Sequence, residues 1–367
     1  MMNPKEQWQQ YCEEELSTLR PLLVRHGFFL NNEQPHLKGE RYLQRAITTE
    51  SGKKLILYGT SANGDKVVIK ATRDRAGQNE LTHERACRKF LHDIDFAATA
   101  FKTPPEVAWI EEDGFVVGIQ LFIEQPRTFL EHTLPEQFDI ALSSFKAQEG
   151  THATTYGHIH RIKKTYEIRT EADYLRNFAD FICHTNSLLP QVHYITTQLE
   201  QTKKILDEHS RTILQYCGFL THTDFVPHNL RIAADETIYL LDHSSLTFGN
   251  KHEGWARFLN FMALYNPELT SLLTKYIQDN RAPEEQESLW LMRLYRLGEI
   301  IFYYAKAQAS SEGELRELNR ARVVFWSTML KQVLRHEELP PEIIRTYQTT
   351  RDRLRSEDEK DRQKGLH

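Results

Sequence analysis

The segment at residues 220–242, LTHTDFVPHNLRIAADETIYLLD, constrains the fold of this chain more than any other. Asp224 lies near its start, Asn229 follows in the same loop, and Asp242 closes the segment. Two short runs of alternating apolar and polar residues flank a polar turn, which predicts a tight hairpin. Because a hairpin brings its ends together, the loop before the first strand should lie beside the residue that leaves the second. We therefore expect Asp224, Asn229 and Asp242 to converge on one spot.

Three oxygen-bearing side chains at one spot suit phosphoryl transfer. That reaction needs a carboxylate to orient the attacking hydroxyl and accept its proton, and oxygen ligands for the magnesium that bridges the phosphates. One loop and one strand end supply all three groups, and His222 completes the pattern HxDxxxxN. The alternative interpretation is an ordinary turn in which His222 and Asp224 cap the backbone.

Length and charge exclude several other classes of protein. The chain has 367 residues, 40% of them hydrophobic, which is enough for two lobes with separate cores and a cleft between them. Its net charge of −5 lacks the basic excess of a general nucleic-acid binder. The start has no apolar signal segment, and the most apolar helix, at 289–305, is interrupted by charges, so we expect no membrane contact. Four separated cysteines without a CxxC pair favour reduced thiols in the cytoplasm.

The first 124 residues are expected to form a helix followed by a small antiparallel sheet. Residues 4–26 have helical spacing of apolar side chains, and the polar segment 31–39 reads as a linker. Alternating apolar runs predict five strands, at 42–48, 55–58, 66–70, 107–110 and 115–123.

Two features of this region are candidates for contacts with a nucleotide. Lys70 ends the third expected strand and Glu84 lies on the helix at 79–91, so the two could form the ion pair that holds nucleotide phosphates. The turn at 48–54 offers Ser51, Gly52 and backbone amides to phosphates, with an ordinary hairpin turn as the alternative. A snorkelling surface lysine is the alternative for Lys70.

The remainder is expected to be mostly helical, beginning after a hinge at Phe122, Ile123 and Glu124 whose backbone could bind an adenine edge. Helices are predicted at 134–148, 172–188 and 192–208, with more following the 220–242 hairpin. We therefore divide the chain into an N-terminal helix and linker (1–35), an N-lobe (36–124), a helical C-lobe with the catalytic loop (125–350) and a charged tail (351–367). The fold class is α+β.

In this order, the strand lysine, helix glutamate, hinge, HTDFVPHN loop and YLLD strand end resemble the aminoglycoside phosphotransferase and choline kinase group of the protein kinase-like fold. The resemblance spans roughly residues 40–260. It implies an ATP- and Mg²⁺-dependent kinase with Asp224 as the catalytic base, Asn229 and Asp242 as magnesium ligands, and His222 as a support for the loop. It also implies that Lys70 contacts the ATP phosphates and that Glu84 positions it.

The sequence departs from that family after Asp242. His243 and Ser244 stand where a protein kinase has Phe and Gly, and no segment resembles an activation loop, which favours a small hydroxyl-bearing acceptor over a protein. The family often has an acidic residue at the start of the next helix, and Arg257 occupies the place where we look for it. The turn at 48–54 has a single glycine where a phosphate-binding loop usually has several. This turn and the departures after Asp242 leave an alternative open, a catalytically weak nucleotide-binding pseudokinase that acts as a scaffold or regulator.

The sequence does not identify the acceptor, which could resemble an aminoglycoside, choline or a sugar. An amine-bearing acceptor would need carboxylates or aromatic side chains, for which Glu149, Tyr156, Glu253 and Trp255 are candidates. The histidines 152, 158 and 160 lie close in sequence, but their spacing is wrong for two ligands on one helical face, so packing or a pocket role is favoured over metal binding.

Overall fold

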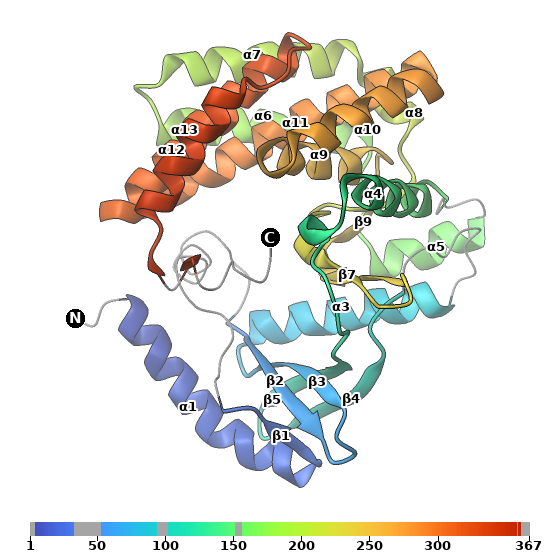
Figure 1. Cartoon of the computed structure of the whole chain (residues 1–367), viewed down its shortest axis with the longest axis vertical. Helices are drawn as coiled ribbons and strands as arrows, with labels where there is room; N and C mark the ends of the chain where they lie inside the picture. The colour runs from blue at the N-terminus through green and yellow to red at the C-terminus, as the bar shows by residue number, and fades with distance from the viewer. Residues whose placement is uncertain (1–3, 33–52, 94–101, 151–155, 358, 361–367) are drawn as a thin grey trace.

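The chain forms two lobes in the computed structural model, which describes residues 4–32, 53–93, 102–150, 156–357 and 359–360 (Figure 1). The N-lobe is built on an antiparallel sheet with the strand order β1-β2-β3-β5-β4. Its strands are β1 (Phe28–Leu30), β2 (Leu55–Ser61), β3 (Lys66–Thr72), β4 (Glu106–Glu112) and β5 (Phe115–Leu121). The predicted α+β class with a five-stranded N-lobe and a helical C-lobe is confirmed.

The membership of this sheet differs in part from the prediction. The expected strands that correspond to β2, β3, β4 and β5 are confirmed, although β5 ends at Leu121 and not at residue 123. The expected strand at 42–48 lies outside the described residues. The fifth described strand is β1, which pairs with β2 through Phe28–Ser61 and Leu30–Gly59. Its three residues are too few to show a period, so only the pairing reveals it.

Two helices flank the sheet. One is the N-terminal helix, and the other lies on the side that faces the C-lobe. Helix α1 (Pro4–Arg25) buries Leu19, Leu22 and Leu23 in the same core as the sheet. Arg73 at the end of β3 binds Glu15 of α1, with Nη2 and Oε1 2.7 Å apart. Helix α3 (Arg75–Asp93) lies between the sheet and the C-lobe, which places Glu84 beside β3 (Figure 1).

The C-lobe is mostly helical, and its predicted helices are confirmed within a few residues. The structure also contains α5, which was not predicted. The helices are α4 (Leu134–Glu149), α5 (Tyr156–Thr165), α6 (Glu171–Leu188), α7 (His193–Glu208), α8 (Ser210–Gln215), α9 (Glu253–Tyr265), α10 (Pro267–Asn280), α11 (Pro283–Ala309), α12 (Gly313–Leu334) and α13 (Pro341–Leu354). No helix in the described part of the chain is both long and apolar enough to cross a membrane.

Two short strand pairs carry the 220–242 segment. Strands β7 (Leu230–Ile232) and β8 (Ile238–Leu240) form the predicted hairpin. Strand β6 (Phe219–His222) pairs with β9 (Leu246–Gly249), which the sequence did not predict. The backbone of Lys102, between α3 and β4, bonds Ile238 and Leu240, so the N-lobe side of the chain is tied to the hairpin.

Helix α11 packs against α6 through Gly298, where a Cβ atom would come within 2.3 Å of the Phe178 ring. Phe178 is fully buried and cannot move aside easily. We expect Gly298→Ala to destabilise the protein by about 1–3 kcal/mol through overpacking, although alanine is normally the better helix former. Urea unfolding of Gly298→Ala, Phe178→Leu and the double variant measures this. The smaller leucine should rescue the alanine, and additive losses would contradict the steric explanation.

Candidate active site

His222 at the end of β6 holds the loop at 223–229 against the residues that leave β8. Its Nε2 atom lies 3.1 Å from the Leu241 carbonyl oxygen and 3.0 Å from that of Asp242. Both partners are acceptors, so this nitrogen carries the proton. The backbone amide of His222 also donates to the Gln148 side chain of α4. His222 is therefore a buried support of the loop, and its Nδ1 atom is buried without a hydrogen-bond partner among the described residues.

Asp224 follows in the loop and is bound on both of its carboxylate oxygens. Asn229, from the one-turn helix η2 (Pro227–Asn229), donates Nδ2 to the Asp224 carbonyl at 2.8 Å and to Oδ2 at 3.3 Å. Arg257 of α9 donates Nε to Oδ1 at 3.0 Å, and its Nη2 lies 2.9 Å from the same oxygen. Burial raises the pKa of Asp224, but the positive charges of Arg257, His228, His222 and Arg296 together outweigh it and hold the pKa below its usual value. Asp224 is thus kept ionised.

Asp242 leaves β8 in a left-handed backbone conformation, with φ 53°. Asn and Asp tolerate this region better than most residues, because a short polar side chain can bond locally. Here Ser244 Oγ donates to Oδ1 at 2.7 Å and Ser245 Oγ to Oδ2 at 2.9 Å. Burial opposes ionisation, yet His222 and Lys70 lower the pKa of Asp242, while the negative charge of Asp224 acts in the opposite sense. The predicted convergence of the loop with the strand end is therefore present.

The strand lysine and the helix glutamate form the expected ion pair. Lys70 Nζ lies 2.5 Å from Glu84 Oε1. The second oxygen of Glu84 is buried without a hydrogen-bond partner among the described residues. Burial would raise the pKa of Glu84, but Lys70 and Lys54 lower it. Lys54, which the sequence reading missed, pairs with Glu80 one turn earlier on α3, so two lysines and two glutamates join the sheet to this helix.

Two other segments, the turn at 48–54 and the hinge at 122–124, were also expected to contact a nucleotide. Ser51 and Gly52 lie outside the described residues. Phe122 donates its amide to the Lys66 carbonyl at 2.9 Å, so that amide is occupied. The Glu124 side chain binds Lys66 at the surface at 2.6 Å. No backbone–backbone hydrogen bond among the described residues uses the amides or carbonyls of Ile123 and Glu124.

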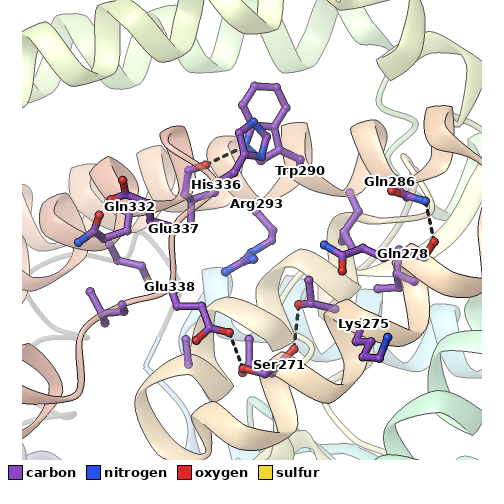
Figure 2. A pocket seen from close by; sticks show the side chains of 18 of the residues that line it. Ser271, Lys275, Gln278, Gln286, Trp290, Arg293, Gln332, His336, Glu337 and Glu338 are labelled. Atoms are coloured by element: carbon purple, nitrogen blue, oxygen red, sulfur yellow. Dashed lines mark hydrogen bonds between the residues drawn. The ribbon is translucent and has the colours of Figure 1, made fainter.

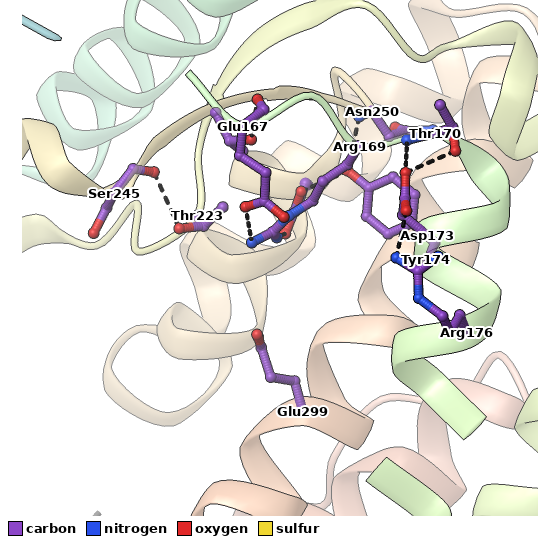
Figure 3. A network of polar contacts seen from close by, with 12 residues as sticks. Glu167, Arg169, Thr170, Asp173, Tyr174, Arg176, Thr223, Ser245, Asn250 and Glu299 are labelled. Atoms are coloured by element: carbon purple, nitrogen blue, oxygen red, sulfur yellow. Dashed lines mark hydrogen bonds and ion pairs between the residues drawn. The ribbon is translucent and has the colours of Figure 1, made fainter. Parts of the chain in front are cut away.

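A buried network behind the loop is centred on Glu253, the first residue of α9. Its carboxylate binds Arg169 at 3.0 Å, Arg296 at 3.2 Å and the Tyr174 hydroxyl at 2.6 Å. Figure 3 shows Arg169 between Glu167 and Tyr174, with Thr223 nearby. Arg296 also donates Nη2 to the Thr223 carbonyl at 2.6 Å, directly before Asp224. The network therefore anchors the loop at 223–229 to α9 and α11.

Comparison with known proteins identifies the fold. No protein-family model matches the sequence, and no curated protein sequence matches it. Among solved structures, a thermostable mutant of the aminoglycoside phosphotransferase APH(4)-Ia matches with a TM-score of 0.56 at 13% identity, covering 86% of this chain and 97% of the other. The macrolide 2'-phosphotransferase MphH from Brachybacterium faecium matches with a TM-score of 0.54 at 14% identity, covering 84% and 98%. The chain has the aminoglycoside phosphotransferase fold.

A third solved structure of similar fold contains bound ligands. The spectinomycin phosphotransferase APH(9)-Ia, in complex with ADP and spectinomycin, has a TM-score of 0.51 at 15% identity and covers 91% of this chain and 98% of its own. The resemblance drawn from the loop and strand-end motifs is thus confirmed at the level of fold.

Within the phosphotransferase fold, the structure corrects one expectation from the sequence. The acidic residue that begins the helix after Asp242 is present as Glu253. Arg257, where the sequence led us to look for an acidic residue, lies one turn further along this helix. Arg257 has a different place, on the carboxylate of Asp224, which no local pattern could indicate because the two are paired only through the fold.

The residues considered for an amine-bearing acceptor lie mostly in the interior of the phosphotransferase fold. Glu253 and Trp255 are buried, and Trp255 stacks on Phe145 at 3.8 Å. Glu149 is paired with Arg281 at 2.7 Å. Of the clustered histidines, His160 is exposed on α5, while position 152 and the side chains of 156 and 158 lie outside the description. No cluster of three or more His, Cys, Asp or Glu able to hold a metal occurs among the described residues.

Proposed function

We propose that the protein is an ATP- and Mg²⁺-dependent phosphotransferase that moves the γ-phosphate to a hydroxyl group of a small molecule. The observation that carries this proposal is the grouping of Asp224, Asn229 and Asp242 within the electrostatic reach of the Lys70–Glu84 pair. Solved structures of similar fold include a ternary complex with AMP-PNP and hygromycin B, which supports a small acceptor. An ATP-dependent reaction also supports a cytoplasmic location.

Asp224 would act on the acceptor. An ionised carboxylate can accept a hydrogen bond from the attacking hydroxyl and take its proton as the bond to phosphorus forms. Arg257 and Asn229 hold this carboxylate in one orientation, so little reorganisation is needed when the acceptor arrives. The main contribution would come from positioning and charge neutralisation, since the loose transition state needs little covalent assistance.

The residues beside Asp224 fit a magnesium ion. Asn229 donates its amide hydrogens to Asp224, which leaves the amide oxygen for a cation, and Asp242 supplies an ionised carboxylate. Magnesium characteristically takes one or two carboxylates together with substrate phosphates and water, so the absence of a larger acidic cluster among the described residues fits this ion. When held by Asn229 and Asp242, the ion would neutralise negative charge that develops on the phosphates.

Lys70 and the hinge would hold the nucleotide. Lys70 offers its ammonium group to the phosphates while Glu84, buried on α3, fixes its position. The free backbone groups of Ile123 and Glu124 would bind the adenine edge. In this proposal the division between lobes follows the hinge, with residues 36–124 on the nucleotide side and 125–350 on the acceptor side.

An acceptor screen coupled to ADP release tests the proposal. We expect at least one alcohol among aminoglycosides, macrolides, choline and simple sugars to stimulate ADP release, and EDTA to abolish the stimulated rate until Mg²⁺ is added back. The phosphorylated product should be visible by mass spectrometry. A stimulated rate that persists in EDTA would contradict the metal assignment, and no stimulation by any acceptor class would contradict the transfer reaction.

One observation favours a second candidate, a nucleotide-binding pseudokinase. Both oxygens of Asp224 are already engaged, Oδ1 by Arg257 and Oδ2 by Asn229, so the carboxylate has fewer free positions for an acceptor. A scaffold would be stabilised by Mg·ATP in thermal denaturation yet show neither acceptor-dependent nor background ADP release. The screen therefore separates the two candidates.

A further inference from the structure

The C-lobe contains a cavity that none of the proposed catalytic residues lines. It has a volume of about 860 Å³, within the range of small-molecule sites, and it lies between α10, α11 and α12 (Figure 2). Leu289 and Met329 form part of its apolar base, while Ser271 and Glu338 meet at its mouth through a 2.8 Å hydrogen bond. The wall between α11 and α12 is closed by Trp290, which stacks on His336 and donates Nε1 to the Val333 carbonyl.

The backbone of His336, which forms part of this wall, adopts an unfavourable conformation. His336 follows the end of α12 in the left-handed region, with φ 56°, where glycine or asparagine is usual. The ring it places on Trp290 is 4.7 Å away between centroids. A non-glycine residue in this region persists only when its surroundings hold it there, so the shape of the cavity is specified by the fold.

A guanidinium group that forms no ion pair with any described residue projects into the cavity from α11, although Glu337 and Glu338 also line this cavity. Arg293 donates Nε to Asn260 Oδ1 at 3.0 Å, and the structure gives its Nη atoms no hydrogen bond or ion pair with any described residue. Figure 2 shows the side chain pointing into the open space between the helices. Arg296, one turn further along α11, binds the carboxylates of Glu253 and Glu299. Burial without a carboxylate lowers the pKa of Arg293 to about 10.

An acceptor in the same cavity also lacks a partner. Gln332 Oε1, on α12, is buried and has no hydrogen bond among the described residues. Buried amide oxygens in folded proteins are normally hydrogen-bonded, so an orphan of this kind indicates a missing water or ligand. The cavity thus has two outer nitrogens of a cationic fork as donors, and one of its lining residues carries a buried acceptor without a hydrogen bond among the described residues.

We propose that this cavity binds a small organic acid, with its carboxylate on the Nη atoms of Arg293 and a hydroxyl or ammonium group donating to Gln332 Oε1. Guanidinium and carboxylate match as forks and can form two parallel hydrogen bonds. The carboxylate supplies the counter-charge that Arg293 lacks, and the donor completes the bonding of the amide oxygen. The binding does not depend on the phosphotransferase reaction, so it stands or falls separately from that function.

Isothermal calorimetry on the full chain tests the proposal with four matched probes. Malate carries a hydroxyl, aspartate an ammonium group, succinate neither, and succinamide no charge. We expect malate or aspartate to bind at least about tenfold more tightly than succinamide, because a hydrogen bond to a charged group is involved. Succinate should lie between them. Whether malate or aspartate is preferred identifies the donor.

Variants assign the binding to the cavity. Arg293→Gln should reduce the affinity for the preferred acid by about 10- to 100-fold, and Gln332→Leu should remove its advantage over succinate. Lys275→Gln is the matched control, because Lys275 is an exposed cation at the rim already paired with Asp279, and it should change affinity less than about twofold. If Arg293→Gln fails to fold, Arg293→Lys keeps the charge without the fork and should also weaken binding.

The proposal is overturned if all four probes bind alike, if none binds below about 10 mM, or if Arg293→Gln binds the acid as tightly as the unaltered protein. If the unaltered protein bound neither malate nor aspartate more tightly than succinate, the role of Gln332 would be overturned. A crystal soaked with the preferred acid should show its carboxylate on Arg293, and a position elsewhere would refute the assignment.

Discussion

Asp224→Asn is expected to reduce the acceptor-dependent rate by about 10²–10⁴-fold, the usual contribution of a general base. Asparagine keeps the shape of the side chain and can still accept a hydrogen bond from Arg257, so the fold of the loop should be retained. It cannot take a proton from the attacking hydroxyl. Binding of Mg·ATP should be unchanged or tighter, because the variant removes one negative charge from the site and releases Arg257 from its carboxylate.

Steady-state kinetics with the acceptor found in the screen, together with calorimetric titration of Mg·ATP, measure these two effects. Asp235→Asn is the matched control, since Asp235 lies in the exposed turn between β7 and β8 and accepts a hydrogen bond from the nearby Thr237 amide at 3.1 Å. Its rate should equal that of the unaltered protein. Full activity in Asp224→Asn would show that the base has been assigned to the wrong residue.

Glu253→Gln is expected to destabilise the protein by about 3–5 kcal/mol, the cost of removing one partner from a buried ion pair. Glutamine preserves the volume but leaves Arg169 and Arg296 facing a neutral group in the interior. Although burial favours their neutral forms, Glu253 contributes to raising the pKa of both arginines in the folded protein. The change would therefore remove a counter-charge that both cations require.

Urea unfolding at neutral pH, followed by circular dichroism, gives the change in the free energy of unfolding. Glu299→Gln is the control, because Glu299 binds the same Arg296 from a half-exposed position on α11 and should cost about 1 kcal/mol or less. A similar loss in both variants would show that the buried position of Glu253 has no special importance. The loop should also loosen in Glu253→Gln, since Arg296 holds the Thr223 carbonyl.

The parts of the fold that the sequence predicted are those with a local signal. The β7–β8 hairpin has two alternating runs and a polar turn, and the helices α4, α6 and α7 have a clear apolar stripe. Strands β1 and β9 have three and four residues, and β9 is buried throughout, so neither shows an alternation. Such strands are specified by their pairing partners, which a single sequence does not display.

The residues of the candidate site also divide into those with a local signal in the sequence and those without one. Lys70 and Glu84 could be predicted because a strand followed directly by a helix places them side by side. Asp224, Asn229 and Asp242 are spaced by one loop and one hairpin. Arg257 could not be predicted in its role, since its contact with Asp224 depends on how α9 is placed against the loop by Glu253 and its arginine partners.

Three residues of helix α9 that make different contacts lie on the same face of the helix. Glu253, Arg257 and Asn260 follow one another at intervals of four and three residues, so they share one face of the helix. Glu253 anchors the fold, Arg257 holds the carboxylate of Asp224, and Asn260 contacts Arg293 at the cavity. Inserting one residue after Ala256 would turn the following part of the helix by about 100° and would detach Arg257 and Asn260 together while leaving Glu253 in place. A substitution at one of these positions changes the contacts of one residue, whereas a change in the length of α9 between them would disrupt the contacts of Arg257 and Asn260 at once.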